Sequence, residues 1–161
     1  KSLAYEGSAR VPFLITAPPE LGLSQGARVD AVATHADIMP TLLDMVGIPV
    51  PGTVDGQSLY GHLRGEPQAD WREYLHIEHA PFQHGLTDGR EKYIWWATDG
   101  REQLFDLTRD PNELKDLAPH APDRVAPWRE RLVARLRDRP ESFVKDGKLV
   151  AGRPYEPVIP G

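Results

Sequence analysis

The sequence predicts an α+β fold, and three observations carry that prediction. A short apolar run closed by prolines indicates a strand near the start, and apolar residues at helical spacing indicate a helix after it. Further on, Asp-Gly pairs separate several apolar runs, and an amphipathic segment follows them. We expect the first strand and helix to be the last such pair of a larger sheet. The second half is expected to be a small antiparallel sheet packed by one C-terminal helix.

The first strand is predicted from the run "VPFLIT" at residues 11–16. Its residues are mostly apolar or β-branched, and the run is too short for a stable helix. Pro18 and Pro19 follow and would end a regular element. We therefore expect a buried strand at this position.

The first helix is predicted from "THADIMPTLLDMVGIP", whose apolar residues recur at helical spacing. Gly47 follows where a left-handed C-terminal residue is needed. Two starting points fit. In the first, Thr34 with Asp37 forms a capping-box pattern, and Pro40 would then lie inside the helix. In the second, Asp37 is the cap, and Pro40 lies in the first turn, where its missing N–H costs little.

The second half begins after a loop with a short helical turn at residues 58–63. The segment "REYLHIEHA" alternates like a strand, and Asp-Gly pairs at 88–89 and 99–100 separate the next runs, which predicts three or four antiparallel strands. An amphipathic helix is expected at about residues 126–137, with Pro127 in its first turn. Its apolar face comprises Val125, Trp128, Leu132 and Leu136.

These elements divide the chain into three parts. Residues 1–66 are interpreted as the end of a larger α/β domain, and residues 67–140 as a small subdomain of antiparallel sheet with its helix. Residues 141–161 are rich in proline and are expected to form an extended tail. The chain has no starting methionine, so we interpret it as a fragment whose N-terminal part is absent.

Composition excludes several functions. The net charge of −5 argues against a surface for nucleic acid or anionic membrane, which needs clustered Lys and Arg. No apolar stretch is long enough to cross a bilayer. The absence of cysteine removes disulfides, thiolate metal sites and a cysteine nucleophile from these residues. The compartment stays undecided.

Five segments together carry a family resemblance. "KSLAYEGSARVP", "DIMPTLLDMVGIPVP", "DGQSL", "TDGREKYIW" and "QLFDLTRDPNELKDL" occur in this order. In sequence and separation they resemble the C-terminal part of the type I sulfatases of the alkaline-phosphatase-like superfamily. The resemblance runs from residue 1 to about residue 118. It implies that residues 1–66 end the sulfatase catalytic domain and that residues 67–140 form its smaller C-terminal subdomain.

The resemblance implies a catalytic role for Lys1, because the lysine that begins this motif reaches the sulfate in the family. A compact ammonium can neutralise charge on a sulfate oxygen as the S–O bond breaks. The rest of the motif has a structural interpretation. Glu6 and Arg10 are expected to pair, and Gly7 is expected to adopt a backbone angle that a side chain would forbid.

The histidines are weaker candidates. In a strand, His76 and Glu78 share one face while His79 lies on the other. This spacing does not by itself force the three or four converging ligands of a zinc site. The resemblance suggests that His79 and His84 bind the substrate or donate a proton to the leaving group. The alternative is that both are partly exposed loop residues.

The resemblance also implies groups that these residues do not supply. The nucleophile would be a formylglycine hydrate, and a divalent metal, usually calcium, would be held by upstream acids; neither motif is present here. We therefore expect the isolated chain to be inactive. The expected partners are a small-molecule sulfate ester, the remainder of its own catalytic domain and a second copy in a homo-oligomer.

Two other functions stay open at this point. One is a phosphodiesterase or phosphonate monoester hydrolase of the same superfamily, which would use similar machinery. The other is a noncatalytic structural or interaction module.

Overall fold

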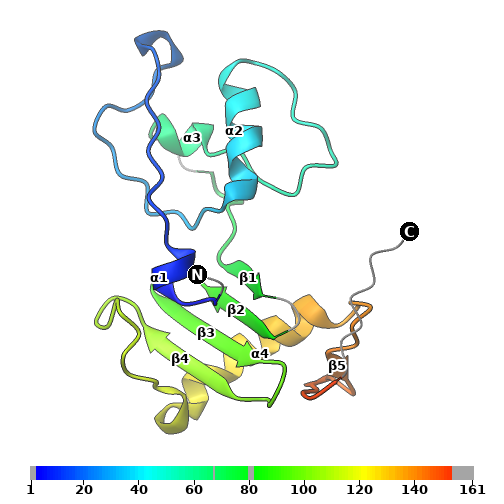
Figure 1. The fold of residues 1–161 in the computed structure, drawn as a ribbon. Helices are drawn as coiled ribbons and strands as arrows, with labels where there is room; N and C mark the ends of the chain where they lie inside the picture. Colours follow the sequence, from blue (N-terminus) through cyan, green and yellow to red (C-terminus); the bar gives the residue numbers. More distant parts are fainter. Residues whose placement is uncertain (1–2, 67, 80–81, 154–161) are drawn as a thin grey trace. The chain divides into compact units, whose positions relative to one another are not determined.

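The computed structural model describes residues 3–66, 68–79 and 82–153. The chain forms two compact units. The larger unit combines Lys1–Val11 with His76–Gly161, and the smaller is the continuous segment Pro12–Leu75. Figure 1 shows their elements along the chain. No helix among the described residues has the length and apolar character needed to cross a bilayer.

The larger unit is built on a four-stranded antiparallel meander in the order β1-β2-β3-β4. The predicted sheet is therefore confirmed, and the Asp-Gly pairs lie at two of its turns. β2 and β3 form the buried centre, with His84 opposite Trp95 in their register. The strands are β1 (Leu75–His79), β2 (Gln83–Thr87), β3 (Glu91–Trp96) and β4 (Glu102–Asp106).

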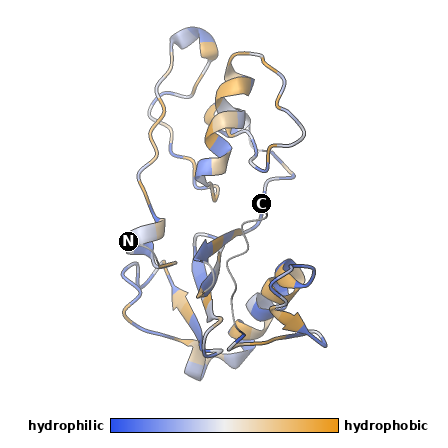
Figure 2. Ribbon diagram, turned by 45° about the vertical axis from the view of Figure 1, so that its right-hand side comes forward, coloured by the Kyte–Doolittle hydropathy of each residue, from blue (hydrophilic) through white to orange (hydrophobic). Residues whose placement is uncertain are grey.

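The predicted C-terminal helix is confirmed as α4 (Pro122–Leu136), which starts earlier than expected. Pro122 occupies its first position, so Pro127 lies inside the helix and not in the first turn. The apolar face of α4 is buried, including Val125 and Leu132, and the Trp128 indole donates a 2.8 Å hydrogen bond to Glu91 of β3. Figure 2 shows the apolar residues that α4 and the sheet contribute.

The tail predicted as extended contains a short hairpin. β5 (Val144–Lys145) pairs with β6 (Lys148–Leu149) across Asp146-Gly147. The Asp-Gly pair at 146–147 was the signal for this turn, and the prolines of the surrounding tail obscured that signal. Residues 154–161 of the predicted tail lie outside the described residues.

In the smaller unit, both predicted starts of the first helix are partly correct. Thr34 and Asp37 form the capping box around the short 3-10 helix η2 (His35–Asp37), and this runs directly into α2 (Ile38–Met45). Pro40 consequently lies in the first turn of α2. Gly47 follows with φ of +70°, as predicted. The expected helical turn is α3 (Tyr60–Leu63).

Asp37 organises this unit from a fully buried position. Its carboxylate accepts hydrogen bonds from the backbone of Thr34 and Gln57, both at 2.8 Å, and from both terminal nitrogens of Arg72 at 2.5 and 2.6 Å. Burial alone raises the pKa of Asp37, but these bonds hold it below its ordinary value. Gly56 packs so closely that a Cβ there would lie 2.0 Å from the carbonyl oxygen of Ala36.

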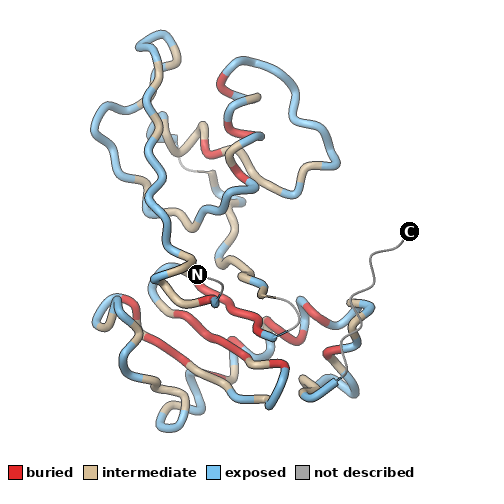
Figure 3. The backbone as a smooth tube through the Cα atoms, in the orientation of Figure 1, coloured by how far each residue is buried: buried red, intermediate tan, exposed pale blue. Residues whose placement is uncertain are grey.

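The strand predicted at residues 11–16 is wrong. Within the described part of the chain this segment pairs with no strand, and Leu14 is 90% exposed. An apolar run becomes a strand only where a neighbouring strand accepts its backbone hydrogen bonds, and none of the described residues provides one. The exposure of this segment is visible in Figure 3, where α2 by contrast has buried as well as exposed positions.

Candidate functional site

The candidate site is the segment that follows Lys1. Lys1 itself lies outside the described residues. Three residues later, Ala4 is fully buried in a core cluster with Ile94 and Phe105. The Tyr5 ring meets Phe105 edge-on at 5.9 Å, and its hydroxyl donates a 2.7 Å hydrogen bond to Gln103. The sheet therefore fixes the chain just after the candidate catalytic residue.

The backbone of Ala4 is fixed as well as its side chain. Its N–H donates a 2.7 Å hydrogen bond to the Gln83 side chain, which is itself fully buried on β2. Gly85 makes room for this contact, because a Cβ at that position would lie 3.0 Å from the Ala4 methyl. A larger residue at Gly85 would press against the segment.

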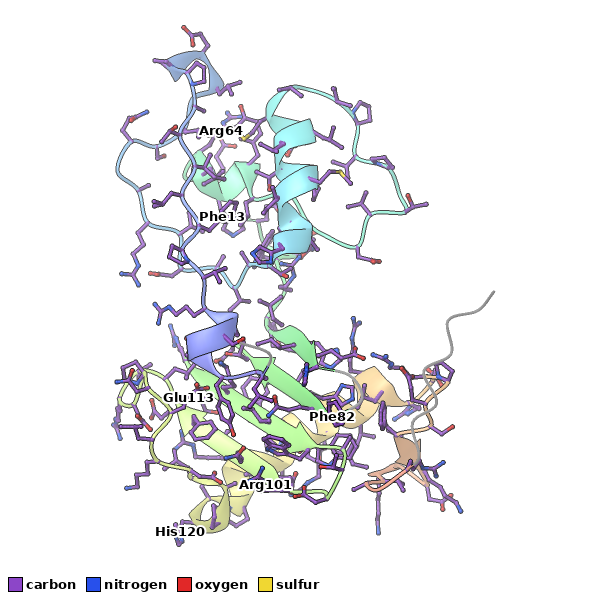
Figure 4. The ribbon with its side chains drawn as sticks, in the orientation of Figure 1. Phe13, Arg64, Phe82, Arg101, Glu113 and His120 are labelled. Atoms are coloured by element: carbon purple, nitrogen blue, oxygen red, sulfur yellow. The ribbon has the colours of Figure 1, made fainter. Side chains whose placement is uncertain are left out.

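A buried ion cluster holds Glu6, the first residue of the short helix α1 (Glu6–Ala9). The fully buried Lys92 ammonium lies 2.6 Å from Glu6 and 3.1 Å from Glu113 Oε1. The first contact is a hydrogen bond; the second is an ion pair whose angle does not meet hydrogen-bond geometry. Glu113 Oε2 also accepts the Glu6 backbone N–H at 2.5 Å. Figure 4 labels Glu113 beside α1.

The predicted contact between Glu6 and Arg10 is present but minor. The two groups lie 3.7 Å apart, and the Arg10 side chain is 64% exposed, so solvent screens the pair. The expectation for Gly7 is wrong. Gly7 lies within α1 and does not have a positive φ, and nothing lies near where its side chain would be.

The histidines of β1 and β2 form a separate group. His76 and Glu78 share a face as predicted, and His84 joins them, with His76 Nε2 lying 3.1 Å from His84 Nδ1. The fully buried His84 ring also packs against Phe143 at 4.8 Å. His79 lies apart from this group, with its ring 5.6 Å from Phe82. The structure thus places the two predicted histidines in different surroundings.

Burial lowers the pKa of His76 and of His84 to about 4, so both are neutral at pH 7. One ring nitrogen then donates to the other across the 3.1 Å contact. His84 Nε2 is buried and has no hydrogen-bond partner within the ranges that the structure describes. His84 Nε2 can therefore still accept or donate a hydrogen bond.

His76, Glu78 and His84 each offer a ligand atom within 4.8 Å of the others, but they do not fit calcium. Calcium requires six to eight oxygen ligands, whereas this group has two imidazoles and one carboxylate. Arg139 also binds both oxygens of Glu78, at 2.5 and 2.9 Å. Its guanidinium occupies the carboxylate with a positive charge and disfavours a metal ion beside it.

An open cleft of about 590 Å³ lies between α4 and the β5–β6 hairpin. Arg129 and Glu102 pair within its lining at 2.7 Å. Glu130, Arg137 and Lys148 also contribute to the lining, so charges of both signs are present. The cleft therefore has no clear preference for an anion.

Sequence reasoning missed Lys92 and Glu113. Strand alternation was the available signal for the first, because Lys92 shares a face of β3 with the fully buried Ile94. No local signal identifies Glu113, whose role depends on a contact with a distant segment.

Known proteins match this chain over most of its length. The family model described as "N-sulphoglucosamine sulphohydrolase, C-terminal" matches residues 1–141. An arylsulfatase of Clostridium perfringens is 38% identical over 160 residues, which cover 96% of this chain and 33% of that protein. A solved 2-O GAG sulfatase aligns with a TM-score of 0.63 and 30% identity, over 81% of this chain and 30% of the other.

A solved phosphonate monoester hydrolase from Silicibacter pomeroyi is also similar. It aligns with a TM-score of 0.57 and 29% identity, over 84% of this chain and 32% of that one. The chain thus spans about a third of the length of these proteins. Since the family model covers residues 1–141, the chain belongs to the sulfatase C-terminal domain family of the alkaline-phosphatase-like superfamily.

Proposed function

We propose that the full-length protein is a sulfatase that hydrolyses sulfate monoesters, and that this chain is its C-terminal portion with Lys1 at the sulfate. The observation that carries the proposal is the fixed segment directly after Lys1. Ala4 is fully buried with its N–H bonded to Gln83, and Glu6 is held by Lys92. A lysine so close to rigid backbone is well suited to a preorganised role.

In this proposal the Lys1 ammonium binds a sulfate oxygen and neutralises the charge that grows as the S–O bond breaks. The formylglycine hydrate would supply the nucleophile and calcium a neighbouring positive charge, both held by residues outside this chain. The contribution of the described residues is orientation. The contacts to Ala4 and Glu6 fix the backbone that follows the lysine.

We also propose that the smaller unit packs against the remainder of the catalytic domain. Support comes from its exposed apolar side chains, which cost free energy in water. Leu42 of α2, for example, is 52% exposed. The other exposed apolar side chains are Met39 within α2, Val46, Ile48 and Val50 after its end, and Phe13 and Leu14 on the segment at residues 11–16.

His79 and His84 enter the proposal as substrate-binding residues. The unpartnered Nε2 of His84 supports an interaction with a group absent from the described residues. To test this, His79→Ala and His84→Gln are compared with wild type in the full-length enzyme. A raised KM or lowered kcat supports the role for the residue concerned, and unchanged constants remove it from the site.

A phosphonate monoester hydrolase or phosphodiesterase is the second candidate, and the similarity to a solved phosphonate monoester hydrolase favours keeping it. Substrate class separates the two. The full-length protein is assayed with calcium on a chromogenic aryl sulfate, a phosphonate monoester and a phosphate diester. The proposal expects sulfate-ester turnover with the largest kcat/KM, whereas a preference for either phosphorus ester supports the second candidate.

The isolated 161-residue chain provides a further test, because it lacks the proposed nucleophile. It is expected to release no sulfate from the aryl ester with calcium present. Sustained turnover by the isolated chain would contradict the proposed location of the nucleophile.

A further inference from the structure

We infer that Lys92 and Glu113 are positioning residues for Lys1, which they hold in place through the backbone of the segment that follows it. The inference rests on the proposed function of Lys1. It concerns the buried cluster of Lys92, Glu6 and Glu113, which joins three segments that are far apart in the chain.

The burial of the cluster makes its geometry costly to disrupt. The Lys92 side chain is 0% exposed, and burying an ammonium without partners costs several kcal/mol. Two carboxylates compensate it, Glu6 with 14% of its side chain exposed and Glu113 with 3%. Removing Lys92 leaves two carboxylates without their shared cation, and removing either carboxylate takes away one of the two partners of the buried ammonium, so the three groups hold one another in place.

Glu113 connects the cluster to the backbone of the segment that follows Lys1. While Oε1 faces Lys92, Oε2 accepts the N–H of Glu6 at 2.5 Å. Gln83 accepts the N–H of Ala4 at 2.7 Å. Two backbone groups within six residues of the start are therefore fixed by buried side chains. Lys1 precedes Ala4 by only three residues, which span at most about 11 Å, so a shift of this anchored backbone is expected to displace the lysine.

The loop that carries Glu113 is bent to present it. Glu113 has a φ of +56°, a left-handed conformation that costs a residue with a side chain about 1 kcal/mol or more. Its N–H bonds the Asp110 carbonyl at 3.1 Å, and the Asp110 carboxylate accepts the Lys115 N–H at 2.8 Å. The turn therefore stabilises an unfavourable backbone angle at the residue that contacts Lys92 and Glu6.

A purely structural role is the competing interpretation, and a double-mutant cycle separates the two. The full-length enzyme is prepared as Lys92→Met, Glu113→Gln, Lys1→Ala and the Lys92→Met/Lys1→Ala pair. kcat and KM for an aryl sulfate are measured well below each variant's Tm. Arg129→Met is the matched control, because it breaks an ion pair between α4 and β4 that does not touch the segment.

If Lys92 acts through Lys1, Lys92→Met lowers kcat by about 10- to 100-fold with KM little changed, as expected for a displaced catalytic group. In the Lys1→Ala background the same change lowers kcat by less than about 3-fold. Arg129→Met keeps wild-type kcat. Glu113→Gln retains an oxygen acceptor for the Glu6 N–H, so it is expected to lower kcat by a smaller factor. This variant replaces Lys92→Met in the test if Lys92→Met does not fold.

The failures are distinguishable. If Lys1→Ala leaves kcat unchanged, the proposed role of Lys1 is wrong. If Lys1→Ala lowers kcat but both cluster variants keep wild-type kcat, the positioning inference is wrong. It is also wrong if Lys92→Met lowers kcat by the same factor in the Lys1→Ala background as in wild type.

Discussion

The two units of the chain differ in how completely they bury their apolar residues. In the larger unit the sheet and α4 enclose a core in which Leu86, Tyr93, Leu104 and Leu132 are fully buried. In the smaller unit, polar Asp37 and Thr41 are fully buried while several large apolar side chains are exposed. The difference indicates that the larger unit folds around its own residues, whereas the smaller unit presents a surface suited to further packing.

The largest expected effect on stability comes from truncating a buried core side chain of the larger unit. Phe105 is 2% exposed and packs with Ala4 and the Tyr5 ring. Phe105→Ala is expected to lower the free energy of unfolding by about 3–5 kcal/mol, because it removes buried apolar surface and leaves a cavity. Urea unfolding followed by tryptophan fluorescence measures this loss. A change below about 1 kcal/mol would contradict the description of this core.

A moderate effect on stability is expected from acid through the buried histidine His84 of the larger unit. The pKa of buried His84 is about 4 in the folded chain, below its ordinary value of 6.5. Below pH 6.5 the unfolded chain binds a proton that the folded chain does not, so stability falls with pH until about pH 4. The loss is on the order of 2–3 kcal/mol.

Urea midpoints measured at pH 7 and pH 4.5 test this dependence. Carboxylates also titrate in this range, so His84→Gln is the control that isolates the histidine. The variant is expected to lose less stability than wild type between the two pH values. Equal losses would show that His84 is not buried in its neutral form.

The smallest effect is expected on the exposed face of α2. Leu42 is 52% exposed, so Leu42→Ser is expected to change the free energy of unfolding of this chain by less than about 0.5 kcal/mol. In the full-length protein the same substitution should be clearly destabilising if the catalytic domain covers this face. Thermal unfolding of both forms measures the contrast, and equal shifts in Tm would contradict the proposed packing.

Local signals predicted the elements that depend on local interactions. The Asp-Gly pairs located the turns of the meander, and helical spacing located α2 and α4. The run at residues 11–16 has the composition of a strand, yet it has no hydrogen-bonded neighbour in the described chain. Composition alone cannot supply that neighbour, because a strand is stabilised by its partners.

The candidate site was predictable to a smaller extent. The resemblance pointed to Lys1, and alternation correctly grouped His76 with Glu78. The contact of Lys92 with Glu113 depends on how the loop after β4 folds back, and that is set by tertiary packing. The full burial of His84 likewise depends on Phe143, which lies far along the chain.

The most direct test of the central claim is the rate of sulfate release from an aryl sulfate by the full-length protein, with and without the Lys1 ammonium. The account predicts that wild type turns over and that Lys1→Met lowers kcat by about 100-fold or more while the protein stays folded. Wild-type turnover by Lys1→Met would contradict it.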